Sequence, residues 1–313
     1  MPTNQPDLGW GEVGEPASFT VLTPDGAALA VWDSGGARPA ARVPTVVLPH
    51  CWGCTHEIWV SVARRLIESG HRVVLYDQRG HGATTRGTAP LTIETLGRDL
   101  AVVLEARKVK NAVLAGHSMG GMTIMSLATY QPDVLAARAR ALVLVATAAA
   151  NASAGTGPGP AQFQAQTERF AAGLMASPAL GTVLGSRNGY RFVRGAFGVN
   201  PSRSHMDLTA HLFGSCDPAV RAGWLVGMAT MNLMKGIASI SLPTTVMVGS
   251  RDRLTGPARA AEIVNAIPGA QLITLPGRGH MLPLEATDDV VDAIVNQSVA
   301  VSASVSASAS ASR

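Results

Sequence analysis

A serine, an aspartate and a histidine are the residues with the clearest chemical potential: Ser118, Asp252 and His280, in that order along the chain. A serine hydroxyl is a weak nucleophile near neutral pH, and it needs a histidine base that an acid orients in turn. Each of the three comes just past a predicted strand: 112–115, 244–248 and 271–275. Because such strands present their sites at their carboxyl ends, we predict that the three side chains meet as a catalytic triad.

Ser118 lies in a Gly-x-Ser-x-Gly pattern, Gly116 to Gly120, after the apolar run 112–115 and before apolar residues at helical spacing. A strand, a sharp turn and a helix in this order predict a strained backbone that exposes the serine hydroxyl. Met119 then begins the helix, so its unpaired N–H is predicted to hold a developing oxyanion. The alternative is that Ser118 only caps the helix.

The other two residues of the predicted triad could each have a structural role instead of a catalytic one. Asp252 could cap a helix that begins near Pro257, and His280 could be a surface histidine among glycines. Their position behind consecutive predicted strands favours the triad. The segment 77–82, Asp-Gln-Arg-Gly-His-Gly, is interpreted as structural, with Asp77 and Arg79 bracing a loop.

The predicted elements that must position these residues place the chain in the α/β class. A hairpin with an Asp-Gly turn comes first, and strands then alternate with helices, which predicts a mostly parallel sheet covered on both faces. Residues 151–241 contain several helical patterns and no clear strand, so they are predicted to be a helical cap inserted into the core. We therefore expect a core of residues 1–150 and 242–297, the cap, and a floppy low-complexity tail at 298–313.

These motifs resemble those of α/β-hydrolases, in the serine esterase/lipase branch of capped, monoacylglycerol-lipase-like and related enzymes. The resemblance rests on residues 116–121, 77–82, the Asp252 loop and residues 277–280, in order. It implies an eight-stranded sheet and a second oxyanion donor, Trp52 N–H, in the loop after the strand at 45–48. Cys51 replaces the usual glycine of that loop. Serine at position 118 argues against branches with an aspartate nucleophile.

The expected function is hydrolysis of a carboxylic ester through an acyl-enzyme, without cofactor or metal. Phenylalanine and methionine side chains in residues 151–241 favour an apolar acyl or aryl ester. The same triad serves C–C bond hydrolases, lactonases, thioesterases and cofactor-free perhydrolases, and these alternatives stay open. More remote alternatives are a hydrolase-fold binding or receptor protein, and a dithiol redox or metal site at Cys51 and Cys54.

Composition narrows the class of partner. A content of 47% apolar and 15% charged residues indicates a well-buried globule. The net charge of +4 is scattered, so nucleic acid is not an expected partner and a small-molecule substrate is. The N-terminal residues lack a secretory signal pattern, and no apolar run is long enough to span a bilayer. Three cysteines form no disulfide framework, which favours a cytoplasmic location. The oligomeric state is not predicted.

Overall fold

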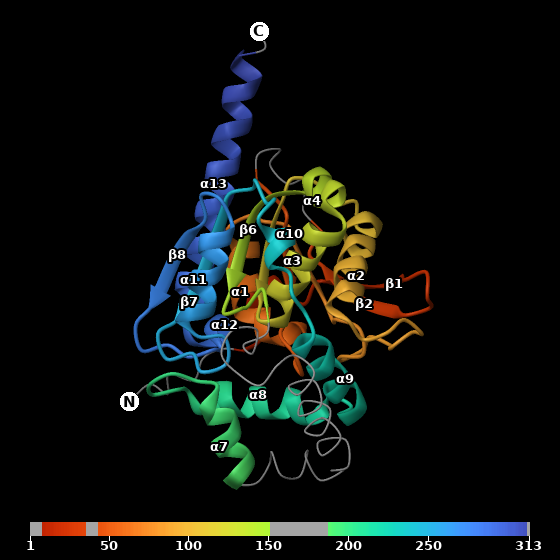
Figure 1. Cartoon of the computed structure of the whole chain (residues 1–313), viewed down its shortest axis with the longest axis vertical. Helices are drawn as coiled ribbons and strands as arrows, with labels where there is room; N and C mark the ends of the chain where they lie inside the picture. Colours follow the sequence, from red (N-terminus) through yellow and green to blue (C-terminus); the bar gives the residue numbers. More distant parts are fainter. Residues whose placement is uncertain (1–7, 36–42, 151–186, 312–313) are drawn as a thin grey trace.

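One eight-stranded sheet organises the structure, a computed structural model that describes residues 8–35, 43–150 and 187–311 (Figure 1). The strand order is β1-β2-β4-β3-β5-β6-β7-β8. The strands are β1 (Ala17–Leu22), β2 (Ala28–Asp33), β3 (Val46–Pro49), β4 (Val73–Tyr76), β5 (Ala112–His117), β6 (Ala139–Val145), β7 (Thr244–Gly249) and β8 (Gln271–Leu275). Strand β2 pairs antiparallel with β1 on one side and with β4 on the other, and all other strand pairs are parallel. The predicted α/β class and eight-stranded sheet are confirmed.

Two hydrophobic layers cover the sheet, one on each face. Strands β3, β4 and β5 are therefore buried along their whole length, which explains why they are apolar runs without alternation. One layer contains α2 (Ile93–Ala106), α3 (Met119–Tyr130), α4 (Pro132–Arg138), α10 (Met234–Ile237) and α11 (Pro257–Ala266). The other contains η2 (His56–Trp59), α1 (Val60–Glu68), α12 (Leu282–Glu285) and the start of α13 (Thr287–Ala311). The short 3-10 helix η1 spans Gly11–Val13. Helix α4 was not predicted.

Helices α7 (Arg187–Gly195), α8 (Arg203–Ser215) and α9 (Pro218–Ala229) lie together beyond one end of the sheet (Figure 1). They contact loops that follow the carboxyl ends of strands: Trp52 Nε1 donates to Arg221 O at 2.9 Å, and Val199 N–H donates to Gly277 O at 2.8 Å. These helices belong to the predicted cap, whose residues 151–186 lie outside the described part of the chain. The domain boundaries stay a prediction.

Helix α13 corrects the expectation of a floppy tail. The predicted tail begins at residue 298, but the helix continues to Ala311 through the Ser/Ala/Val segment. Alanine is the strongest helix former, and it alternates with serine here, which accounts for the continuation. The far half of α13 projects away from the core on the side opposite α7–α9 (Figure 1). Across the described residues no helix has both the length and the apolar character that a bilayer crossing requires.

Candidate active site

Ser118 lies at a strained turn between β5 and α3, as its motif predicts. Its backbone has φ 54° and ψ −115°, a combination that residues other than glycine rarely adopt. The turn is tight because Gly116 contacts the backbone of Gly120, and a Cβ at either glycine would overlap neighbouring main chain. Ser118 N–H donates to Val145 O at 2.9 Å, and Thr147 Oγ1 donates to Ser118 O at 2.7 Å. These bonds hold the strained residue in place.

Asp252 and His280 follow β7 and β8, and their side chains are in contact. His280 Nδ1 lies 3.0 Å from Asp252 Oδ2, and both residues are buried. Burial alone would raise the pKa of the Asp252 carboxyl, but the His280 imidazole and N–H donors from Leu254 and Thr255 lower it well below its usual range. Asp252 therefore stays ionised at neutral pH, as an acid that orients a histidine must.

A buried histidine joins the Ser118 turn to the His280 loop. His117 Nε2 lies 2.8 Å from His280 O, which requires the proton of His117 to be on Nε2, and the two imidazole centroids are 5.0 Å apart. Ser118 is the next residue after His117, so the predicted nucleophile and the predicted base lie on adjoining backbone segments. The structure thus brings the Asp252–His280 pair and the Ser118 turn to one place, at the carboxyl ends of β5, β7 and β8.

The loop after β3 carries Trp52, the predicted second oxyanion donor, and two buried histidines hold it. His50 Nδ1 lies 2.7 Å from Cys51 O, while its Nε2 accepts from Gln78 N–H at 2.8 Å. His81 Nε2 accepts from Gly53 N–H at 3.0 Å. Cys51 O and Trp52 N–H belong to the same peptide group, so the His50 contact orients that N–H. Trp52 N–H has no acceptor among the described residues, which leaves it open to a substrate oxygen.

Three buried histidines predict a pH-dependent stability. Burial lowers the pKa of His50 and of His117 to about 4, and that of His81 to about 3. The unfolded chain titrates near 6.5, so it binds more protons than the folded chain below that pH, and stability falls as the pH falls. We expect each of the three to remove roughly 2 kcal/mol of unfolding free energy between pH 7 and pH 5.

Urea denaturation at these two pH values measures the effect. His81→Gln keeps an acceptor for Gly53 N–H but does not titrate, so its stability should fall less than that of the wild type by about one histidine's share. An equal fall in both proteins would contradict the assignment of His81.

The surroundings of Cys54 disfavour a redox role for that thiol. Cys51 and Cys54 are free and buried. A hydrogen bond with the Cys51 thiol, together with burial, raises the pKa of Cys54 well above its usual range. Burial raises the pKa of Cys216 to about 12. Thiol exchange and metal binding need the thiolate, so both are disfavoured here. The described part of the chain contains no group of three or more metal-ligating side chains placed to hold an ion.

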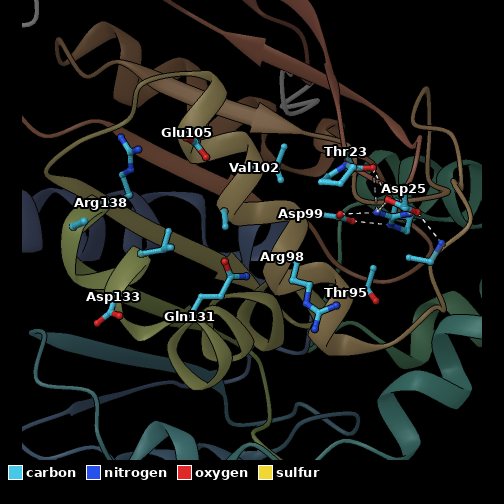
Figure 2. Close-up of a pocket in the computed structure, with 16 residues that line it drawn as sticks. Thr23, Asp25, Thr95, Arg98, Asp99, Val102, Glu105, Gln131, Asp133 and Arg138 are labelled. Carbon is cyan, nitrogen blue, oxygen red and sulfur yellow. Dashed lines mark hydrogen bonds and ion pairs between the residues drawn. The ribbon is translucent and has the colours of Figure 1, made fainter.

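The segment 77–82 is held as a structural loop, as predicted. Asp77 accepts from His56 N–H at 2.9 Å and Ala83 N–H at 3.0 Å. Arg79 is buried and forms ion pairs with Asp25 at 2.5 Å and Asp99 at 2.7 Å. These two carboxylates lie at one end of a cavity of about 650 Å³ along α2 (Figure 2). None of the predicted site residues lines this cavity. Thr23, Asp25 and Asp99 gather around Arg79 at one end, and the other labelled side chains do not converge on one point (Figure 2).

Several residues around the site could not be assigned from the sequence. Thr255 Oγ1 donates to Asp252 Oδ2 at 2.9 Å and lies 3.2 Å from His280 Nδ1. Three histidines contact backbone atoms of residues that are distant in the chain and adjacent only in the folded protein: His117, His50 and His81. The sole signal for them was their position inside the recognised motifs, which does not reveal a partner.

Comparison with known proteins identifies relatives. Residues 46–293 match the model of the alpha/beta hydrolase family. A curated relative, the sn-1-specific diacylglycerol lipase ABHD11 of Mus musculus, is 24% identical over 268 residues, 82% of this chain and 81% of the lipase. The 3-oxoadipate enol-lactonase 1 of Acinetobacter baylyi is 36% identical over 90 residues, 29% of this chain and 33% of the lactonase. A solved structure of a hydrolase from Pseudomonas aeruginosa PA01 superimposes with a TM-score of 0.74 at 26% identity, covering 90% of this chain and 97% of that one.

Proposed function

The chain belongs to the alpha/beta hydrolase family, and from this premise we propose that it is a serine hydrolase that cleaves carboxylic esters through an acyl-enzyme on Ser118. The observation that carries the proposal is the buried Asp252–His280 pair beside the strained Ser118 turn, with His117 joining them. The relatives add support, since diacylglycerol lipase and enol-lactonase are named for compounds that carry a carboxylic ester bond, a lactone being a cyclic ester.

In the proposed mechanism Ser118 Oγ attacks the ester carbonyl carbon while His280 Nε2 accepts the hydroxyl proton. Asp252 keeps the other imidazole proton on Nδ1 and stabilises the imidazolium that forms. Met119 and Trp52 N–H donate to the oxyanion, and each such donor lowers the barrier by about 3 kcal/mol. His280 then protonates the departing alcohol, and water, activated by the same imidazole, releases the acid and frees Ser118.

The proposed substrate is an apolar acyl or aryl ester. Trp52 packs edge to face against Phe213 of α8 at 5.1 Å between ring centroids, so aromatic surface lies directly beside the oxyanion loop. Arg221 donates to Phe213 O, which ties that aromatic contact to α9. An apolar group bound near this contact would leave water, and this desolvation favours apolar esters.

Labelling by a fluorophosphonate tests the nucleophile without knowledge of the natural substrate. We expect a covalent adduct on the peptide that contains Ser118, detected by mass spectrometry, and hydrolysis of a chain-length series of nitrophenyl esters that the label abolishes. A protein that resists labelling and hydrolyses none of the esters would contradict the proposal, and so would an adduct on a different serine. Screening lactones and thioesters in the same assay distinguishes the related reactions of the triad.

A further inference from the structure

Glu285 is the last residue of α12, five positions after His280, and its carboxylate accepts from three backbone N–H groups. Oε1 accepts from Met281 N–H at 3.1 Å, and Oε2 accepts from Gly198 N–H at 2.7 Å. Gly279 N–H lies 3.2 Å from Oε1 and 3.1 Å from Oε2. Both oxygens of the Glu285 side chain are therefore engaged as acceptors, and no oxygen is left without a backbone donor.

Two of these donors flank His280 directly in the chain. The backbone of His280 itself is also bound on both sides: its N–H donates to Ala196 O at 2.7 Å, and its carbonyl accepts from His117 Nε2 at 2.8 Å. The N–H groups of residues 279–281 thus all have acceptors, and Glu285 supplies two of the three. A shift of this backbone would move the imidazole relative to Ser118, so these contacts define where the proposed base lies.

The third donor, Gly198, belongs to the segment 196–199 between α7 and α8, within the predicted cap. This segment runs against the His280 loop, and Gly198 and Gly279 approach so closely that a Cβ on either would overlap the backbone of the other. Glu285 is therefore the charged group that contacts the cap segment and the histidine loop at once.

We propose that Glu285 is a positioning residue that orients His280 for proton transfer and couples the cap segment 196–199 to that histidine. This inference rests on the proposed hydrolase function, because it assigns Glu285 to the orientation of the general base. Glu285→Gln preserves the shape of the side chain but replaces one acceptor oxygen with an NH₂ group. Because both oxygens accept, either orientation of the amide directs a donor at a backbone N–H: at Met281 of the histidine loop or at Gly198 of the cap segment. One of the two segments must then move.

The test compares wild type, Glu285→Gln and Glu285→Asp in three measurements: nitrophenyl ester turnover, the rate of fluorophosphonate labelling of Ser118, and the melting temperature. A 1 Å misplacement of a reacting group is enough to lower a rate about a hundredfold, so we expect kcat and the labelling rate of Glu285→Gln to fall about tenfold to a hundredfold. KM should stay within about threefold, because substrate binding precedes proton transfer. Glu285→Asp keeps the charge and should recover part of the rate.

Glu262→Gln is the matched control, because Glu262 lies on α11, is paired with Arg259 and has no hydrogen bond to Ser118, Asp252 or His280. It should match the wild type in all three measurements. A Glu285→Gln protein that is labelled and turns over at the wild-type rate would overturn the inference. Rates that fall only in parallel with the melting temperature, with no recovery in Glu285→Asp, would overturn it too. A wild-type protein without labelling at Ser118 would instead overturn the proposed function itself.

Discussion

Replacing Ser118 with alanine should lower kcat for nitrophenyl esters by at least about a thousandfold, because the proposed acyl-enzyme forms on the Ser118 hydroxyl. The oxyanion donors and the binding site remain in this variant, so a small residual rate above that of water is expected. KM should change little, since the hydroxyl contributes to the reaction more than to binding. Steady-state kinetics with the best ester of the chain-length series measures both constants.

Ser126→Ala is the matched control for this substitution. Ser126 lies on the same helix, α3, and its hydroxyl is buried without a hydrogen-bond partner among the described residues. Its removal should leave turnover unchanged. Wild-type turnover in Ser118→Ala would remove the serine hydrolase hypothesis and favour a different nucleophile or a binding protein.

Replacing Asp252 with asparagine should lower kcat by about a thousandfold to ten-thousandfold, although the shape of the site is kept. The carboxylate accepts from Leu254 N–H, Thr255 N–H and Thr255 Oγ1 as well as facing His280 Nδ1. An asparagine amide has two orientations at this position. In one, its NH₂ group faces Nδ1 of His280, which favours the wrong imidazole tautomer. In the other, its NH₂ group faces the N–H donors of Leu254 and Thr255, so two donors point at each other. The base is then neither oriented nor stabilised as an imidazolium.

The pH dependence of kcat provides a second measurement on Asp252→Asn, because at high pH a hydroxide ion can partly replace the lost base. We expect the rate of this variant to keep rising with pH where that of the wild type has levelled. Asp133→Asn, an exposed acid of α4, serves as the control and should match the wild type. A kcat of Asp252→Asn within about tenfold of the wild type would show that another acid orients His280.

The strands and the candidate triad were predictable because their signals are local. The apolar runs that became β3, β5 and β7 are contiguous in the chain, and Ser118 and Asp252 each follow such a run by a few residues. His280 follows β8, which is mostly exposed, so its prediction depended on residue order alone. Burial on both faces imposes the apolar run, and the fold imposes the position of the loop. The strand and the loop that follows it can therefore both be predicted from the order of residues in the chain.

The contacts that hold the site were not predictable, since they join side chains to distant backbone atoms. His81 accepts from Gly53 N–H, 28 residues away, and Glu285 accepts from Gly198 N–H, 87 residues away. Neither contact has a periodicity or a motif, because a backbone donor has the same chemistry at every residue. The continuation of α13 through residues 298–311 was not predicted for a different reason: the low-complexity composition was interpreted as a floppy tail, although alanine favours the helix.

The direction of α13 has a practical consequence for handling the protein. The helix leaves the core on the side opposite α7–α9. The His280 loop contacts the segment that follows α7, because His280 N–H donates to Ala196 O, and His117 joins this loop to the Ser118 turn. A linker joined after Ala311 would therefore attach the molecule to a bead or a sensor chip with its reactive end toward the surrounding liquid. Tethering in this orientation keeps the support away from α7–α9.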